Sequence, residues 1–120
     1  MPSTTPYKRG DIVLVPFPFT DLSTTKQRPC LVLASFKPKG LNEHLVVAMM
    51  TSHVSGFGFL HDVRLMNWQK SGLPKPTLIR LAKVVTLDRM LVKRKLGRLL
   101  KPDQQSIVTK FKELFLPLLS

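Results

Sequence analysis

Gly10-Asp11-Ile12-Val13-Leu14-Val15-Pro16 is the stretch of this 120-residue sequence that limits the choice of fold most narrowly. Its apolar run has the length of a strand, and glycine and proline at its two ends are typical of strand boundaries. The stretch therefore predicts a β-strand over residues 11–15.

Four further segments have the length and composition of strands. Residues 29–34 and 45–50 are apolar runs separated by turn-forming residues, which predicts two neighbouring strands. Residues 62–66 alternate between polar and apolar side chains, as a strand with one buried face does. Residues 77–87 are rich in β-branched side chains, which predicts one long strand.

The end of the sequence changes from a strand pattern to a helical one. Apolar residues beyond Asp103 recur at spacings of one, three and four, and Pro102 or Asp103 could open the helix. The last part of this stripe, residues 114–119, is more apolar than one amphipathic face requires, and both core packing and a dimer contact would explain it. The stripe consists of Ile107, Val108, Phe111, Leu114, Phe115 and Leu118.

Strands followed by one terminal helix predict an α+β fold. Five or six short strands with irregular loops favour a small, twisted, partly closed antiparallel β-barrel with a C-terminal α-helix. The length suits one hydrophobic core, and neither a repeat nor a linker divides the sequence. Residues 1–120 are therefore expected to form a single domain.

Charge is the strongest indication of a partner. Nineteen Lys and Arg residues against seven Asp and Glu residues give a formal charge of +12, which attracts polyanions. Nucleic acid is the first expected partner, and a membrane surface is second because the start of the sequence has no basic amphipathic helix or lipidation signal. No apolar run reaches the roughly 20 residues that span a bilayer, and no signal segment is evident, so a cytoplasmic protein is expected.

Three groups of residues resemble a known family. The first combines residues 10–15 with Phe17-Pro18-Phe19-Thr20-Asp21 and residues 26–33, the second is residues 46–52, and the third is residues 87–99. In this order they resemble the PemK/MazF toxins of type II toxin–antitoxin systems. The resemblance implies an SH3-like barrel that dimerises, cleaves single-stranded RNA without a metal ion, and is held inactive by a cognate antitoxin.

Metal-free RNA cleavage needs few protein groups, because the 2′-OH of the substrate is the nucleophile. The protein must stabilise charge at phosphorus and assist two proton transfers. Arg28 suits the first task, since a guanidinium donates to two phosphate oxygens and Pro29 favours an extended backbone where a loop enters a strand. Thr51 and Ser52 end an apolar strand with hydroxyl groups that could orient the reacting groups. The resemblance makes Thr51 a catalytic position with Ser52 beside it, so Arg28, Thr51 and Ser52 are the predicted catalytic residues.

A second set of residues is predicted to bind RNA. Lys26 and Gln27 precede Arg28 in the family-like segment, and His53 lies on the same side as Thr51 if the strand continues. Residues 80–101 hold eight basic residues and one acidic residue, a local excess of +7 that is typical of a polyanion-binding surface. The predicted phosphate contacts there are Arg80, Lys83, Lys93, Arg94 and Lys95. Aromatic candidates for stacking on unpaired bases are Phe17, Phe19, Phe57 and Trp68.

The sequence predicts neither a metal ion nor a cofactor. Three histidines and the single Cys30 lack a zinc-binding spacing, and Cys30 in its apolar run is expected to be a small buried hydrophobe. The general base is left open, because a guanidinium titrates at about 12.5 or higher and is a poor base. Asp11 lies at the start of the first predicted strand, and Asp21 and Asp88 could equally be turn or cap residues. Some relatives carry Glu where this chain has residues 80–83, Arg-Leu-Ala-Lys, which argues against a carboxylate-assisted mechanism.

Two functional hypotheses follow. The first is an endoribonuclease toxin with a cognate antitoxin, for which an acidic, partly disordered segment would complement the basic surface. The second is a non-catalytic protein, either a nucleic-acid-binding barrel or a toxin that blocks gyrase in the manner of the structurally related CcdB toxins. The combination of Arg28-Pro29 with Thr51 favours the nuclease, because a pure binder has no need for it.

Overall fold

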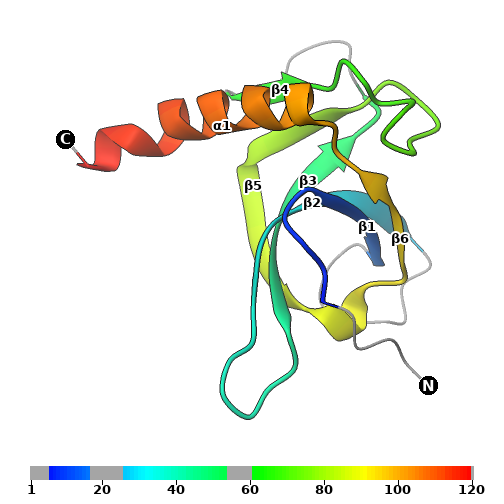
Figure 1. Cartoon of the computed structure of the whole chain (residues 1–120), viewed down its shortest axis with the longest axis vertical. Coiled ribbons are helices and arrows are strands. Elements are labelled where there is room, and N and C mark those ends of the chain that lie inside the picture. Colours follow the sequence, from blue (N-terminus) through cyan, green and yellow to red (C-terminus); the bar gives the residue numbers. More distant parts are fainter. Residues whose placement is uncertain (1–5, 17–25, 54–60, 120) are drawn as a thin grey trace.

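The computed structural model describes residues 6–16, 26–53 and 61–119, in which six strands and one long helix are found (Figure 1). The strands in chain order are β1 (Asp11–Pro16), β2 (Gln27–Phe36), β3 (His44–Thr51), β4 (Asp62–Arg64), β5 (Leu78–Asp88) and β6 (Arg94–Arg98). The helix is α1 (Lys101–Phe115), and two short 3-10 helices are η1 (Arg89–Leu91) and η2 (Leu116–Leu119). None of the described helices is long and apolar enough to cross a membrane.

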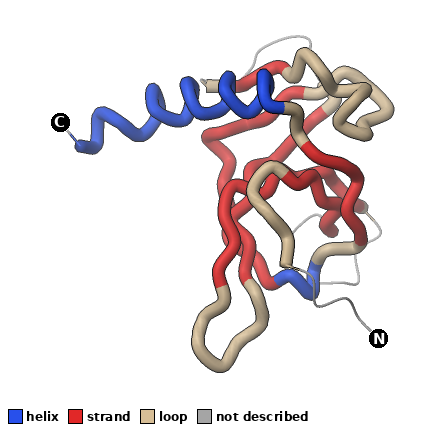
Figure 2. Tube along the Cα trace, in the orientation of Figure 1, coloured by secondary structure: helices blue, strands red, loops and turns tan. Residues whose placement is uncertain are grey.

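All six strands form one antiparallel sheet in the order β4-β5-β3-β2-β1-β6. The sheet curls strongly but does not close, so β4 and β6 are its edges. Figure 2 shows α1 lying across one end of the curled sheet, with its C-terminal half extending beyond it, while the β2–β3 hairpin projects at the opposite end. The predicted α+β class, with a twisted antiparallel sheet and a C-terminal helix, is confirmed.

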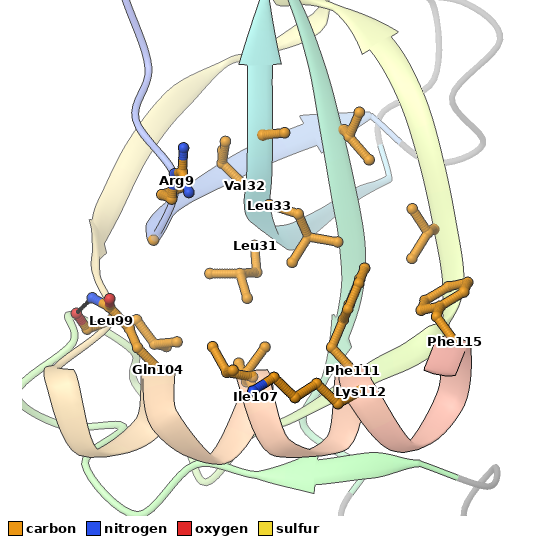
Figure 3. A pocket seen from close by; sticks show the side chains of 15 residues that line it. Arg9, Leu31, Val32, Leu33, Leu99, Gln104, Ile107, Phe111, Lys112 and Phe115 are labelled. Carbon is orange, nitrogen blue, oxygen red and sulfur yellow. Dashed lines mark hydrogen bonds between the residues drawn. The ribbon is translucent and has the colours of Figure 1, made fainter. Parts of the chain in front are cut away.

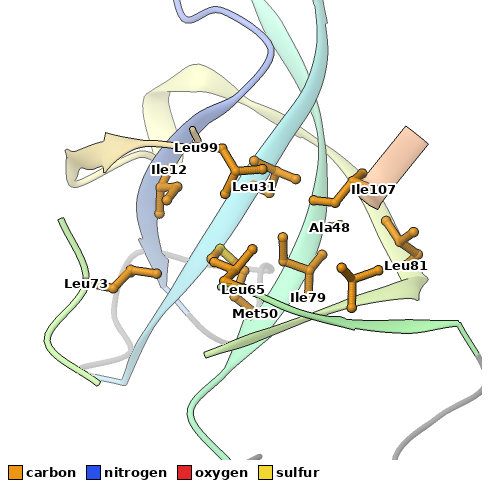
Figure 4. Close-up of a cluster of buried hydrophobic side chains, with 11 residues drawn as sticks. Ile12, Leu31, Ala48, Met50, Leu65, Leu73, Ile79, Leu81, Leu99 and Ile107 are labelled. Carbon is orange, nitrogen blue, oxygen red and sulfur yellow. The ribbon is translucent and has the colours of Figure 1, made fainter. Parts of the chain in front are cut away.

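Apolar side chains are buried on both faces of the sheet, which explains why the central strands read as continuous apolar runs. Alternate residues of a strand point to opposite faces, and neighbours such as Ile12 and Val13 accordingly belong to two different core clusters. The larger cluster, drawn in Figure 4, lies on the face that α1 covers through Ile107. Cys30 lies in the other cluster with Val47, fully buried as the sequence predicts.

A loop covers the gap between the two sheet edges. The segment after β4, residues 65–77, lies directly against β6, with backbone against backbone. A Cβ atom on Gly97 would stand 1.8 Å from the carbonyl oxygen of Ser71, and one on Gly72 would stand 2.5 Å from that of Leu96. Gly72 also has a φ of 92°, in the left-handed region that favours glycine. Two glycines therefore let this loop pack closely against β6, which has no strand partner on that side in the described part of the chain.

Three details of the predicted secondary structure are wrong. Residues 94–98 belong to the predicted basic surface and to no predicted strand, yet they pair with the free edge of β1 as β6. The predicted strand over residues 62–66 ends at Arg64, because the backbone N–H groups of Met66 and Asn67 donate to a side chain on α1 instead. The helix begins at Lys101, ahead of the predicted start.

The side chain that accepts those two hydrogen bonds is Asp103, one of the two predicted opening residues of the helix. Pro102 does lie in the first turn of α1, as predicted, but the Asp103 carboxylate is buried and accepts from Met66 and Asn67 at 2.9 Å each. Asp103 therefore does not cap its own helix. It fastens the start of α1 to the segment that follows β4.

Candidate active site

Arg28 and Thr51 lie at the same end of two paired strands. Cys30 of β2 pairs with Met49 of β3, and two further residues along each strand lead to Arg28 and Thr51. Arg28 also pairs with Val15 of β1. The predicted guanidinium and hydroxyl are therefore brought together by the register of the central sheet.

Both residues line one cavity of about 590 Å³ at this end of the sheet, which we call the β2–β3 cavity. Strands β1, β2, β3 and β6 and the segment after β4 all contribute to it. Ser52 and Gln27, two further predicted site residues, are among its walls. The lining residues are Leu14, Gln27, Arg28, Pro29, Met50, Thr51, Ser52, Gly72, Leu73, Pro74, Lys75, Thr77, Arg94 and Leu96.

Arg94 reaches the cavity through the pairing of β6 with β1, which the sequence does not predict. Leu14 of β1 pairs with Pro29 on one side and with Arg94 on the other. Residues paired directly across antiparallel strands point to the same face of the sheet, so these three side chains line one wall. Arg94 is the one member of the predicted basic group 93–95 that lines the cavity.

The hydroxyl of Thr51 is held in place by its own chain. The backbone N–H of His53 donates to Thr51 Oγ1 at 3.1 Å, so one lone pair of the oxygen is occupied. The hydroxyl proton stays available for donation, because a threonine hydroxyl has one donor and two acceptor positions. The prediction that His53 lies on the same side as Thr51 requires the strand to continue, but β3 ends at Thr51. The His53 side chain is exposed and is not among the lining residues of the cavity.

The remaining predicted RNA contacts lie outside the cavity lining. Arg80 forms an ion pair with Asp62 at 3.1 Å, and Lys95 forms one with Asp11 at 3.2 Å. Lys93, Lys26 and Lys83 are exposed, and none of them is among the lining residues. These five and His53 stay predictions for contacts beyond the cavity. Trp68 packs partly buried against the core, whereas Phe17, Phe19 and Phe57 lie outside the described residues.

A further wall of the cavity is formed by the segment after β4, which holds none of the predicted catalytic residues or phosphate contacts. Lys75 and Thr77 of this segment line the cavity together with residues at the strand ends. Thr77 is buried and donates from Oγ1 to the carbonyl of Lys75 at 2.8 Å. A lysine between Pro74 and Pro76 was the available signal, since two prolines restrict the backbone that presents it.

The charged residues in the described lining of the cavity are all cationic, and this lining contains no carboxylate. Asp11 is buried at the start of β1, where it binds Lys95 and Arg98, and Asp88 caps η1 through the N–H of Met90. Asp21, the other acidic candidate, lies outside the described residues. Arg28, Lys75 and Arg94 thus form a site suited to a polyanion.

Neither the thiol nor a metal cluster offers other chemistry in the described residues. Burial raises the pKa of the Cys30 thiol to about 12, so this cysteine stays protonated near neutrality. Within residues 6–16, 26–53 and 61–119, no group of three His, Cys, Asp or Glu side chains is arranged to hold a metal ion.

A second hollow, the α1 groove, lies between the helix and the face of β2 (Figure 3). It has a volume of about 460 Å³ and apolar walls that include Leu31, Leu33 and Phe111. Ile107 and Leu114 of the predicted helix stripe pack on the core, but Phe111 and Phe115 are each 40% exposed, with their rings 4.5 Å apart. Core packing within this chain therefore explains only part of the stripe.

Comparison with known proteins agrees with this architecture. The family model for the PemK-like, MazF-like toxin of type II toxin–antitoxin systems matches residues 8–115. A search of curated protein sequences gave no match.

Solved structures share the fold at low sequence identity. The Mycobacterium tuberculosis toxin MazF-mt6 is 20% identical, with a TM-score of 0.65 over 88% of this chain and 95% of that chain. An endoribonuclease in complex with its cognate antitoxin from Mycobacterial species is 15% identical, with a TM-score of 0.64 over 88% and 90%. MazE-MazF from Deinococcus radiodurans is 19% identical, with a TM-score of 0.64 over 91% and 94%. With the family model covering nearly the whole sequence, the chain belongs to the PemK-like, MazF-like toxins of type II toxin–antitoxin systems, a family of endoribonucleases.

Proposed function

We propose that this chain cleaves single-stranded RNA without a metal ion, in the cytoplasm, and that the β2–β3 cavity is its active site. The observation that carries the proposal is the placement of Arg28 and Thr51 in one cavity whose described charged residues are all cationic. The family supplies the reaction class, and the cavity supplies a phosphate-binding site with a hydroxyl beside it.

The proposed step is an internal displacement at phosphorus. The 2′-oxygen of the RNA forms a bond to phosphorus while the bond from phosphorus to the 5′-oxygen breaks. The 2′-OH loses its proton and the departing 5′-oxygen gains one, which leaves a 2′,3′-cyclic phosphate and a 5′-OH. Negative charge grows on the non-bridging oxygens, and this is where a fixed cation lowers the barrier.

Arg28 is the residue we assign to that charge. A guanidinium is planar and can donate to two phosphate oxygens at once, which a lysine cannot do. Its backbone pairs with Val15 of β1, and Pro29 after it restricts the backbone to an extended form, so the side chain starts from a fixed position. Thr51 is assigned to orient the reacting groups, with Ser52 beside it at the cavity wall.

Purified protein incubated with a mixed single-stranded RNA pool in EDTA tests the proposal. Cleavage should persist, and the products should carry 5′-OH ends that accept labelled phosphate without prior dephosphorylation. Arg28→Ala should lower kcat about 10²- to 10³-fold, and Arg28→Lys should recover only part of it. Arg64→Ala, an exposed arginine of β4 outside the cavity, is the matched control and should cleave normally.

Two results would contradict the proposal. Cleavage that stops in EDTA would show a metal requirement. Activity that is equal in the wild type and in Arg28→Ala preparations would indicate a contaminating ribonuclease, and the non-catalytic hypothesis would then be preferred.

Two partners belong to the proposal. The exposed apolar residues of α1 at the α1 groove support a homodimer, in which a second copy would cover Phe111 and Phe115. The net charge of +12 supports a cognate antitoxin with an acidic segment that covers the basic cavity. Among the similar structures, one is described as an endoribonuclease in complex with its cognate antitoxin.

A further inference from the structure

We propose that Lys75 forms a second anion subsite in the β2–β3 cavity, where it binds an RNA phosphate next to the scissile one. The inference rests on the function proposed above, because it takes the cavity as the place where RNA is held. It assigns an RNA-binding role to a residue in the segment after β4, for which the sequence predicts no role in the site.

The segment that carries Lys75 is fixed at both ends. At its start, Asp103 of α1 accepts from the backbone N–H groups of Met66 and Asn67, at 2.9 Å each. The N–H of Leu65 donates to the carbonyl of Thr77 at 3.0 Å, which joins the start of the segment to its end. Because these bonds tie the segment to a helix and to itself, residues 65–77 form a closed loop with a defined base.

The middle of the segment is fixed against the core and against β6. Leu73 is 6% exposed and belongs to the larger core cluster, and its N–H donates to the carbonyl of Trp68 at 3.1 Å. Gly72 lies so close to Leu96 that no side chain would fit there. The wall therefore cannot move toward or away from β6 without losing core packing.

Lys75 itself combines a fixed backbone with an exposed side chain. Pro74 and Pro76 restrict the backbone on either side, and the buried Thr77 donates to the Lys75 carbonyl at 2.8 Å. The side chain is nevertheless exposed, at the wall of the cavity. The backbone loses its conformational entropy when the protein folds, so a ligand that binds Lys75 has to immobilise only the side chain.

The chemistry of the cavity indicates what Lys75 binds. Arg28 and Arg94 line the same cavity, and none of its described lining residues is a carboxylate. Three cations around one space suit a chain of phosphodiesters better than a single small anion. An ammonium is a point charge without the planar fork of arginine, so Lys75 should add affinity with little dependence on base sequence.

The test uses an uncleavable single-stranded oligonucleotide with 2′-O-methyl riboses, bound to the full-length protein and followed by fluorescence anisotropy. Lys75→Gln should weaken binding about tenfold at low salt. It should also reduce the slope of log K against log salt by about 0.7, the value for one phosphate contact on a single strand. Lys75→Arg should restore both. Lys39→Gln, at the tip of the β2–β3 hairpin, is the matched control and should change neither.

Each outcome decides a separate point. Equal binding by Lys75→Gln and Lys39→Gln overturns the subsite, and so does a loss that appears with some base sequences only, which would indicate a base contact. A wild-type protein that binds the oligonucleotide through Lys75 but cleaves no RNA would leave the subsite standing and overturn the nuclease proposal. If the wild-type protein cleaves RNA but Lys75→Gln binds the oligonucleotide as tightly as the wild type, the nuclease proposal stands and the subsite is overturned.

Discussion

The backbone N–H of His53 donates a hydrogen bond to the hydroxyl oxygen of Thr51, at 3.1 Å. This bond fixes the hydroxyl at the wall of the β2–β3 cavity and leaves its proton free to donate. A side chain that keeps the hydroxyl can preserve both functions, whereas one of equal shape without it cannot. The distinction separates a chemical role for Thr51 from a purely structural one.

Thr51→Val is therefore expected to lower kcat about 10²-fold, because a donor near the reacting phosphate is lost while the volume is kept. Thr51→Ser should stay within a few-fold of the wild type in the same RNA cleavage assay. Thr86→Val, an exposed threonine of β5 outside the cavity, is the control and should have no effect. If Thr51→Val cleaves as fast as the wild type, Thr51 has no part in the reaction.

Asp103→Asn is expected to loosen the wall that carries Lys75. Asparagine has one acceptor oxygen, so its NH₂ group would face one of the two N–H groups that the carboxylate now binds. The free energy of unfolding should fall by about 1–3 kcal/mol, measured by urea denaturation, and the amides of Met66 and Asn67 should exchange faster.

The matched control is Asp88→Asn, which alters an exposed carboxylate that accepts one backbone bond from Met90. It should cost about 1 kcal/mol or less. An equal decrease in the free energy of unfolding for Asp103→Asn and Asp88→Asn would show that the hydrogen bonds between α1 and the cavity wall stabilise the protein no more than an ordinary cap does.

Acid should weaken the connection between β1 and β6. Burial raises the pKa of Asp11, but the backbone N–H of Lys8, the guanidinium of Arg98 and the ammonium of Lys95 outweigh it and hold this pKa below its usual value. The folded protein thus binds this proton less readily than the unfolded chain. The stabilising contribution of Asp11 is present above the ordinary carboxyl pKa of about 3.9 and is lost as pH falls through the folded value.

Urea denaturation at pH 7 and near pH 3 measures this effect. The difference in stability between the wild type and Asp11→Asn should be large at pH 7 and smaller in acid. A difference that stays the same at both pH values would show that the ionised form of Asp11 is not what stabilises the fold.

Phe111→Glu should separate the proposed dimer. Phe111 is 40% exposed at the α1 groove, and a charge placed there would be buried by a second copy without a partner. Sedimentation should show a dissociation constant raised by about tenfold or more. Thr109→Glu, an exposed residue of the same helix outside the groove, should leave association unchanged. A wild-type chain that sediments as a monomer at all concentrations would refute the dimer.

Local composition predicts the central strands well, because both faces of β1, β2 and β3 are buried and their apolar runs are continuous. It does not predict β6, where Arg94-Lys95-Leu96-Gly97-Arg98 has weak strand propensity and pairs because β1 offers it an open edge. Arg28 and Thr51 could be chosen in advance from the ends of such runs. Lys75 was harder to choose, because the sequence marks it only by its two flanking prolines and does not show that the segment after β4 meets the ends of β2 and β3 in one cavity.

The close approach of Gly97 to Ser71 also bears on how the family can diverge. A β-carbon at position 97 would overlap the Ser71 carbonyl at 1.8 Å, so any homologue with a larger residue there must route the preceding loop along another path. The part of the cavity wall that residues 72–77 form would then be displaced as well. The residue at position 97 in a sequence alignment thus distinguishes relatives that keep a cavity of this shape, which have glycine there, from relatives whose cavity has another shape.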